Sequence, residues 1–197
     1  MKAYLNDVSI KAKYLDRVRA HAAADEIIHG KYWEDGKGCA VGCTIHSGNH
    51  LDYESKLGIP VMLARLEDRL FEGQSNGCSK EFPERFLLAA KVGAYLSRVG
   101  WKFLYWLLTE ELAGRDDLQV AAQIKRCADV LVPLTKGEPA DKEEARKAAD
   151  AAADAAYAAG AYAAAEQKCY ERMAEKLLEL MAECPGEPIR VAMGVAA

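Results

Sequence analysis

The chain has 197 residues, of which 51% are hydrophobic and 28% are charged, and its formal net charge at pH 7 is −4. This balance is typical of a soluble globular protein, and it argues against direct nucleic-acid binding, which usually needs a basic surface. The sequence has a charged start and lacks the long apolar run of a membrane span. We therefore expect a cytoplasmic protein without a membrane anchor.

The six cysteines are expected to be mostly free thiols, because disulfides are rare in cytoplasmic proteins of this size. Strand patterns are scarce, whereas Ala, Leu, Glu, Lys and Arg dominate. The sequence therefore predicts an all-α fold, with a multi-helix, bundle-like body and a long Ala-rich C-terminal helix.

In chain order, a first helix is predicted to begin near Asn6 or Asp7 and to continue to His29. Gly30, the next residue, is expected to stop it. The segment KYWEDGKG is rich in Gly and Asp and predicts a turn. CAVGCTIHS, which has no charge before His46, predicts a short buried helix, and LDYESKL predicts another that Gly58 ends.

The middle of the chain contains the clearest amphipathic pattern, VMLARLEDRLFEG, which predicts a helix over residues 61–73 behind Pro60. QSNGCS is expected to be a loop, and the next helix is expected to begin at Pro83. The densest aromatic group is expected to form the centre of the core. Its members are Trp101, Phe103, Tyr105 and Trp106.

Residues 1–135 are interpreted as the helical body, which ends with an amphipathic helix in DLQVAAQIKRCADVLV, and residues 136–140 as a linker. Residues 141–184 have one glycine and no proline, and they predict one long helix because Ala has the highest helix propensity. This helix is expected to dock onto the body or to form a homodimer. Residues 185–197 form a tail.

All four histidines lie between residues 21 and 50. On the predicted first helix, His21, Asp25 and His29 share one face, because they are four residues apart. Glu26 and His29 also form the Glu-x-x-His pair that di-iron helix bundles use, although such bundles need two copies and the chain has one. The alternative is that these residues make only surface ion pairs.

A second group would lie on one face if its segment stayed helical: Cys39, Cys43, His46, His50 and Glu54. Zinc takes such Cys and His ligands, but the C-x3-C and H-x3-H spacings match no familiar zinc motif. A second hypothesis makes Cys43 a catalytic nucleophile with His46 or His50 as its base. In the third, the two cysteines are core thiols and the histidines are hydrogen-bonded structural residues.

The candidate catalytic residues are therefore Cys43, His46 and His50, and the sequence does not decide whether the protein is an enzyme. No cofactor is established, although the donor set is compatible with zinc or iron. The candidate metal ligands are His21, Glu26, His29, Cys39, Cys43, His46, His50 and Glu54.

One block resembles a family of uncharacterised bacterial and phage-type proteins. It comprises GCAVGCTIHS at residues 38–47, His50, YE at residues 53–54, LGIP at residues 57–60 and LED at residues 66–68. The resemblance covers about residues 20–90 and implies a phage or prophage setting, but it carries no activity.

The leading functional hypothesis is an all-α, non-enzymatic interaction protein that acts on a host protein. A protein partner is expected, and the long helix would support a homodimer. The alternative is a metal-binding protein, or a metal- or thiol-dependent enzyme, that uses the His, Cys and Glu residues between positions 21 and 54.

Overall fold

The computed structural model describes residues 1–111, 118–141, 143–144, 147 and 163–187. Within this part the predicted all-α fold is confirmed, and the strands are limited to one two-residue hairpin. None of the described helices has the length and apolar character needed to cross a membrane. The N-terminal half contains η1 (Ala3–Asn6), α1 (Val8–Ala23), β1 (Trp33–Glu34), β2 (Lys37–Gly38), α2 (Ala40–Ile45), η2 (Tyr53–Leu57), α3 (Val61–Gly73) and α4 (Asn76–Ala89).

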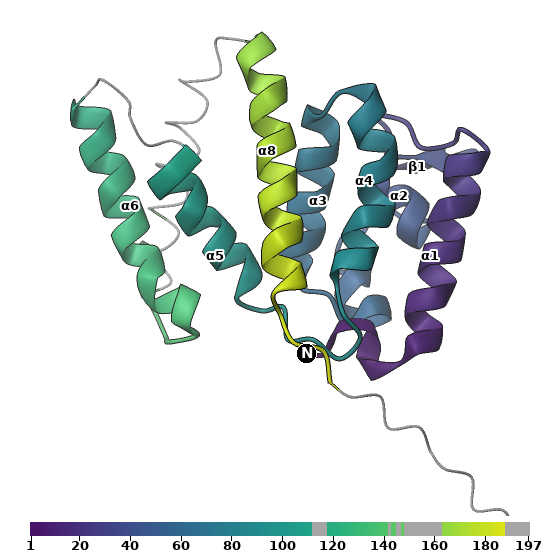
Figure 1. The fold of residues 1–197 in the computed structure, drawn as a ribbon, viewed down its shortest axis with the longest axis horizontal. Helices are drawn as coiled ribbons and strands as arrows, with labels where there is room; N and C mark the ends of the chain where they lie inside the picture. Colours follow the sequence, from purple (N-terminus) through teal and green to yellow (C-terminus); the bar gives the residue numbers. More distant parts are fainter. Residues whose placement is uncertain (112–117, 142, 145–146, 148–162, 188–197) are drawn as a thin grey trace, which may run out of the picture.

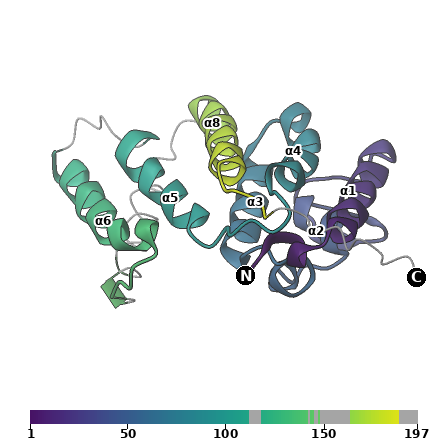
Figure 2. The same cartoon turned by 60° about the horizontal axis from the view of Figure 1, so that its bottom comes forward.

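The C-terminal half continues the row of helices that Figures 1 and 2 show, in which α8 lies between α5 and the pair formed by α3 and α4. Beyond α5 lies α6, and α1 stands at the opposite end with α2 packed beside it. The elements are α5 (Val99–Trp106), η3 (Leu107–Glu111), α6 (Leu118–Lys136) and α8 (Ala163–Ala182).

The main core lies among α1, α2, α3, α4 and α8. Its largest side chains have less than 2% of their surface exposed: Tyr4, Tyr53, Phe71, Phe82, Phe86 and Phe103. A smaller cluster joins η3 to the apolar side of α6. In that cluster Ile124, Cys127, Ala128 and Leu131 are buried, which fits the amphipathic helix predicted there.

The prediction for the aromatic group was wrong except for Phe103. Tyr105 is 37% exposed, and Trp101 and Trp106 are only partly buried. The reason is the position of α5, which lies between α8 and α6 and outside the central helices. The aromatic centre comes instead from η1, η2, α3 and α4.

The first helix is shorter than predicted. It begins after Asp7, whose carboxylate accepts the backbone N–H of Ser9 at 2.7 Å, and it ends at Ala23 rather than His29. The chain leaves the helix because it pairs with β2: Ile28 N donates to Gly38 O at 2.8 Å, and Gly38 N donates to Glu26 O at 3.0 Å. This pairing buries Ile27, so tertiary contacts replace the next helical turn.

Two further boundaries differ from the prediction. QSNGCS is not a loop throughout, because α4 begins at Asn76 and Pro83 lies inside the helix. Likewise α6 continues through Pro133 to Lys136, after which Gly137 adopts a φ of +82° and ends the helix. The helix over residues 61–73 and the short helix beginning at Ala40 are confirmed.

The predicted long helix is described over Ala163–Ala182, whereas residues 148–162 lie outside the described part. The described portion packs against α3, α4 and α5 and buries Leu177 and Met181 completely. Tyr170 lies directly over Gly73, where an added Cβ would meet the tyrosine ring at 2.4 Å. The helix α8 is therefore part of the main core.

Replacing Leu177 with Ala should lower the free energy of unfolding by about 2–5 kcal/mol, because the substitution leaves a cavity between α8 and its neighbours. Urea unfolding followed by circular dichroism measures this loss. The matched control is Leu88→Ala on α4, where the side chain is 46% exposed and the expected change is within about 0.5 kcal/mol. Equal effects of the two substitutions would contradict the core position of α8.

Candidate functional site

The candidate site residues gather at the two ends of the short helix α2. At its N-terminal end Cys39 lies near Asp68 and Glu72 of α3, and at its C-terminal end His46 lies near His21 of α1. We call the first group, Cys39, Asp68 and Glu72 together with His50, the acid–thiol cluster. The second group, His21 and His46 together with Glu26, is called the imidazole pair.

A tight hairpin places both groups. Asp35 and Gly36 connect β1 to β2 with φ values of 51° and 83°, as a type I′ turn requires. The sequence predicted only a turn here, although Asp-Gly is a strong hairpin signal. The preceding residues Tyr32 and Trp33 each cover one group. The Tyr32 ring contacts His50, and the Trp33 ring stacks on His46.

The helix α2 packs directly on the backbone of this hairpin. A Cβ added at Gly42 would lie 1.4 Å from the carbonyl oxygen of Tyr32, and one added at Gly38 would lie 2.1 Å from the same atom. No side chain fits there, so the two glycines let the helix approach the hairpin backbone. The short helix is completely buried from Ala40 to Ile45, and its two ends carry the polar groups.

In the imidazole pair, the two Nε2 atoms of His21 and His46 face each other at 2.8 Å. The Nδ1 atom of His21 lies 2.6 Å from a carboxylate oxygen of Glu26. Because an ionised carboxylate only accepts, Nδ1 of His21 carries a proton, and its Nε2 is left as an acceptor when the ring is neutral. His46 then donates from its own Nε2, and at most one proton can lie between the two rings.

The position of His46 is unusual in two respects. Its backbone is left-handed, with a φ of 54°, because it is the residue that ends α2. Its ring stacks on Trp33 with a centroid separation of 4.2 Å and an interplanar angle of 11°. Partial desolvation of the ring, with the positive charge of Arg17 as a second cause, lowers the pKa of His46. The neutral form of the ring is thus favoured.

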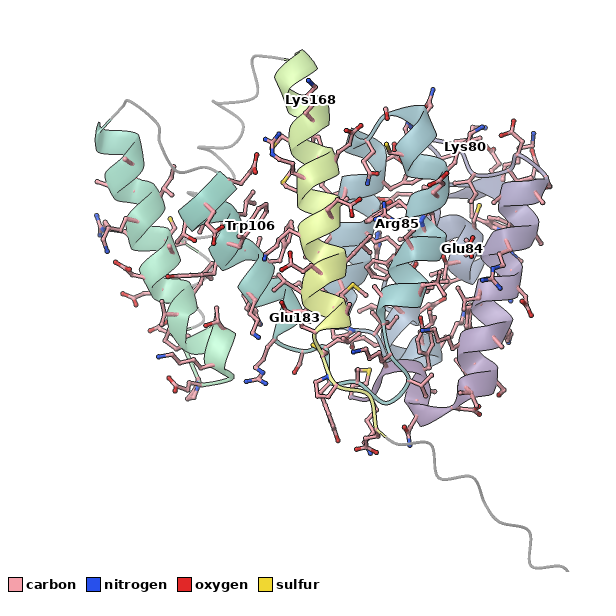
Figure 3. The ribbon with its side chains drawn as sticks, in the orientation of Figure 1. Lys80, Glu84, Arg85, Trp106, Lys168 and Glu183 are labelled. Carbon is pink, nitrogen blue, oxygen red and sulfur yellow. The ribbon has the colours of Figure 1, made fainter. Side chains whose placement is uncertain are left out.

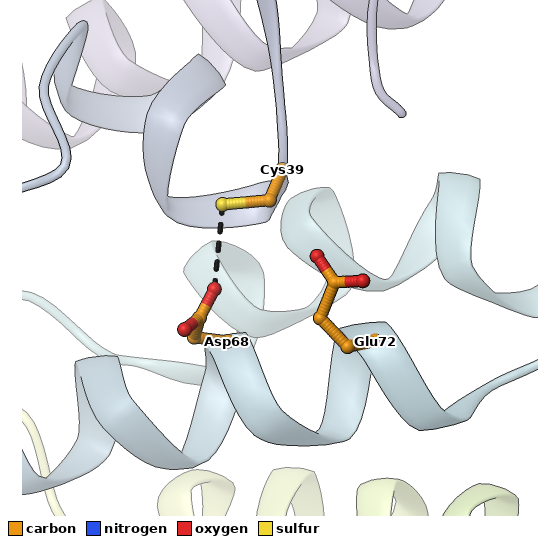
Figure 4. A group of neighbouring side chains, drawn as sticks. All are labelled: Cys39, Asp68 and Glu72. Atoms are coloured by element: carbon orange, nitrogen blue, oxygen red, sulfur yellow. Dashed lines mark hydrogen bonds between the residues drawn. The ribbon is translucent and has the colours of Figure 1, made fainter. Parts of the chain in front are cut away.

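In the acid–thiol cluster, one donor atom each from Cys39, Asp68 and Glu72 lies within 4.8 Å of the other two (Figure 4). The Cys39 thiol donates to Asp68 Oδ1 at 3.3 Å. The other carboxylate oxygen of Asp68 lies 3.3 Å from Nε2 of His50. Glu72, which is exposed, accepts the backbone N–H of Gly30 with both oxygens, at 3.1 and 3.0 Å.

The charges of this cluster affect its neighbours. The carboxylate of Asp68 raises the pKa of the Tyr32 hydroxyl, which burial raises further. Burial raises the pKa of the Cys39 thiol to about 12, and the nearby charge of Asp68 acts in the same direction. Without a cation, Cys39 is therefore a neutral thiol at pH 7.

The structure does not favour the hypothesis of Cys43 as an activated nucleophile. Its sulfur lies 3.3 Å from Gly38 O and 3.6 Å from Glu26 O, and burial raises its pKa to about 12. A nucleophilic thiol needs a lowered pKa. The sulfur lies at the backbone of the hairpin, so the environment matches the core-thiol alternative.

The two helical faces predicted from spacing were wrong. His29 lies in the loop after α1, where its ring contacts Phe71 edge-on at 4.7 Å and Nε2 is buried without a hydrogen-bond partner among the described residues. Asp25 pairs with Lys80 instead of a histidine. In the second group the helix ends at Ile45, so Glu54 lies apart and accepts the backbone N–H of Val61 at the start of α3.

Two members of the acid–thiol cluster, Asp68 and Glu72, were absent from the predicted site, and so were Tyr32 and Trp33, whose rings contact the two groups. Asp68 and Glu72 are four residues apart on α3, so they share the face that α2 approaches. This spacing was a usable signal, whereas nothing in the sequence placed α3 beside Cys39.

A buried acid lies next to the cluster in the sequence. The Glu67 side chain has no exposed surface, and one of its oxygens accepts the Tyr53 hydroxyl at 2.6 Å, while the other has no partner among the described residues. Burial raises the pKa of Glu67 to about 8 from an ordinary value of 4.5. Glu67 is therefore mostly protonated at pH 7, in the buried core next to the acid–thiol cluster.

A separate hollow lies between α4, α8 and Trp106, on the part of the molecule where Figure 3 labels Arg85, Trp106 and Lys168. Several of the charged side chains that line it are in ion pairs. Arg85 donates to both oxygens of Glu175, at 2.7 and 2.6 Å, and Arg172 pairs with Glu111. Exposed pairs of this kind contribute little stability and do not concentrate unpaired charge. The acid–thiol cluster and the imidazole pair are therefore stronger candidates for a functional site than this hollow.

Comparisons with models of known protein families, with curated proteins and with solved structures gave no match. The resemblance to phage-type proteins, the protein partner and the homodimer therefore stay predictions. The chemistry of the two groups at the ends of α2 is what the structure offers for a functional argument.

Replacing Gly42 with Ala should lower the free energy of unfolding by about 2 kcal/mol or more, because the new methyl group overlaps the Tyr32 carbonyl. Thermal and urea unfolding measure the change. Gly77→Ala in α4 is the control, since nothing lies within 4 Å of its Cβ position, and it should be neutral or stabilising by up to about 1 kcal/mol. A fully stable Gly42→Ala variant would show that the hairpin and α2 are not in close contact.

The buried Glu67 should make stability depend on pH. Because its pKa is raised in the folded state, its contribution is complete below about pH 4.5 and is lost as the pH rises through about 8. The expected slope is at most about 1.4 kcal/mol per pH unit. Glu67→Gln, which stays neutral, should flatten the slope between pH 5 and 8, as measured by urea unfolding at several pH values.

The control for this measurement is Glu183→Gln, an exposed residue directly after α8 (Figure 3), which should keep the wild-type slope. An unchanged slope in Glu67→Gln would assign the pH dependence to other groups. If Glu67→Gln does not fold, Tyr53→Phe serves as the second variant. It removes the hydrogen bond between Tyr53 and Glu67 but keeps the acid.

Proposed function

We propose that the protein binds a divalent transition-metal ion of the zinc class at the acid–thiol cluster. The observation that carries the proposal is the convergence of one sulfur and two carboxylate oxygens within 4.8 Å of each other. Donors around one zinc ion lie at about 2.0–2.3 Å from the metal, which brings them to such mutual distances. These three atoms come from two elements that only the tertiary fold brings together.

Each donor has a distinct role in this proposal. Cys39 would supply a thiolate, which favours zinc over the magnesium and calcium that prefer oxygen ligands. Asp68 and Glu72 would supply oxygens from successive turns of α3. His50 contacts Asp68 rather than the sulfur, so it would fix the orientation of that carboxylate through a hydrogen bond to Oδ2.

Three protein ligands leave one position of a tetrahedral ion for water or a substrate oxygen, as in catalytic rather than structural zinc sites. The position of Glu72 on the exposed side of the cluster supports access from solvent. The Cys39 thiol must lose its proton to bind the ion, and the elevated pKa of the metal-free thiol makes this step costly. Binding should therefore strengthen as the pH rises.

Cobalt(II) is a direct probe, because thiolate ligation produces a charge-transfer absorption that oxygen and nitrogen ligands do not. The full-length protein should bind cobalt with this absorption, and zinc should displace the cobalt. Cys39→Ser should abolish the absorption, while its hydroxyl still suits the N-cap position of α2. Asp68→Asn should weaken binding by at least tenfold.

Cys43→Ser is the matched control, because Cys43 is equally buried one turn along the same helix. It should keep the cobalt absorption. The proposal is wrong if the wild-type protein binds no stoichiometric cobalt or zinc. It is also wrong if the absorption survives Cys39→Ser, since another thiol would then be the ligand.

A further inference from the structure

We propose that the imidazole pair is a second and separate site for an ion of the zinc class, with Nε2 of His21 and Nε2 of His46 as its ligands. The two atoms point at each other from different elements, α1 and the C-terminal end of α2, and lie 2.8 Å apart. Neutral imidazole is a common ligand for zinc and copper. The site uses only nitrogen donors, unlike the acid–thiol cluster at the other end of α2.

The contact between His21 and Glu26 supports this assignment. A histidine that binds a metal through one nitrogen usually donates from the other to a carboxylate or carbonyl, which fixes the ring and strengthens the ligand. His21 has this arrangement already, with Nδ1 at 2.6 Å from Glu26 and Nε2 directed at Nε2 of His46. Glu26 is thus a positioning residue, and its negative charge also offsets part of the charge of the ion.

The ion would take the place of the proton between the two rings. When both rings are neutral, His46 holds that proton on Nε2, and binding moves it to Nδ1 of the same ring, so no proton is lost overall. Two nitrogens bound to one zinc ion lie about 3–3.4 Å apart, so the present separation must widen by roughly half an ångström. His46 can move, because this residue is exposed, whereas His21 is anchored by Glu26.

Trp33 shapes the surroundings of the pair. Its ring stacks on His46 and contacts His21 edge-on at 5.3 Å, so it covers one side of both ligands. Water would complete the coordination on the exposed side. Arg17 lies near His46 and disfavours added positive charge, and its guanidinium is engaged by the carbonyl oxygen of Thr44, to which it donates at 2.9 Å.

The test uses zinc and the full-length Cys39→Ser variant, in which the acid–thiol cluster has lost its sulfur. With nitrogen-15 in the histidines, nuclear magnetic resonance reports each ring nitrogen separately. Addition of zinc should shift the Nε2 signals of His21 and His46, and it should leave those of His29 and His50 in place. The emission of Trp33, isolated by comparison with Trp33→Phe, should change over the same zinc range.

His46→Asn removes one ligand while keeping a residue that tolerates the left-handed backbone, and it should weaken zinc binding at least tenfold. Glu26→Gln should weaken it by about 10–100-fold with both rings present. Unshifted Nε2 signals, or equal affinity in His46→Asn, would overturn the site. Because the background lacks Cys39, this result is independent of the cobalt absorption in the wild-type protein.

Discussion

The close contact between α2 and the carbonyl of Tyr32 is the constraint on which both the acid–thiol cluster and the imidazole pair depend. Gly38 and Gly42 leave room for this carbonyl, and any side chain at either position would overlap it. The contact holds α2 so that its N-terminal end faces α3 and its C-terminal end faces α1. A helix of six residues is far too short to be stable alone, so packing rather than propensity sets its position.

The hairpin and the main core together position the residues of the two groups. The hairpin contributes Tyr32 and Trp33 to the two groups, and its second strand pairs with the chain after α1. That pairing ends α1 early and brings Glu26 beside His21. On the other side, α3 buries one face in the core, including Glu67, and presents Asp68 and Glu72 to Cys39. One helix therefore provides both core packing and candidate metal ligands.

Much of the local structure could be predicted from the sequence. The helix over residues 61–73 was predicted with its observed bounds, and the short buried helix and the helix end at Gly58 were also predicted. The errors occurred where a tertiary contact overrides a local preference. Ile27 leaves the helix pattern to pair with Gly38, and α4 begins before its proline. The concentration of histidines pointed to the region between residues 21 and 50, and whether this region is functional stays a prediction. The predicted sharing of helical faces was wrong, because both helices end earlier than the spacing required.

The sequence by itself determined the helical class, the amphipathic stripes and the region that carries the reactive side chains. These properties follow from composition and periodicity, which are local. Only the tertiary structure decided that His21 meets His46, that Cys39 meets Asp68, and that His29 and Glu54 belong to neither group. The physical reason is that ligand convergence depends on the relative rotation and spacing of helices. Those are set by distant contacts, such as two glycines against one carbonyl oxygen, which no single segment encodes.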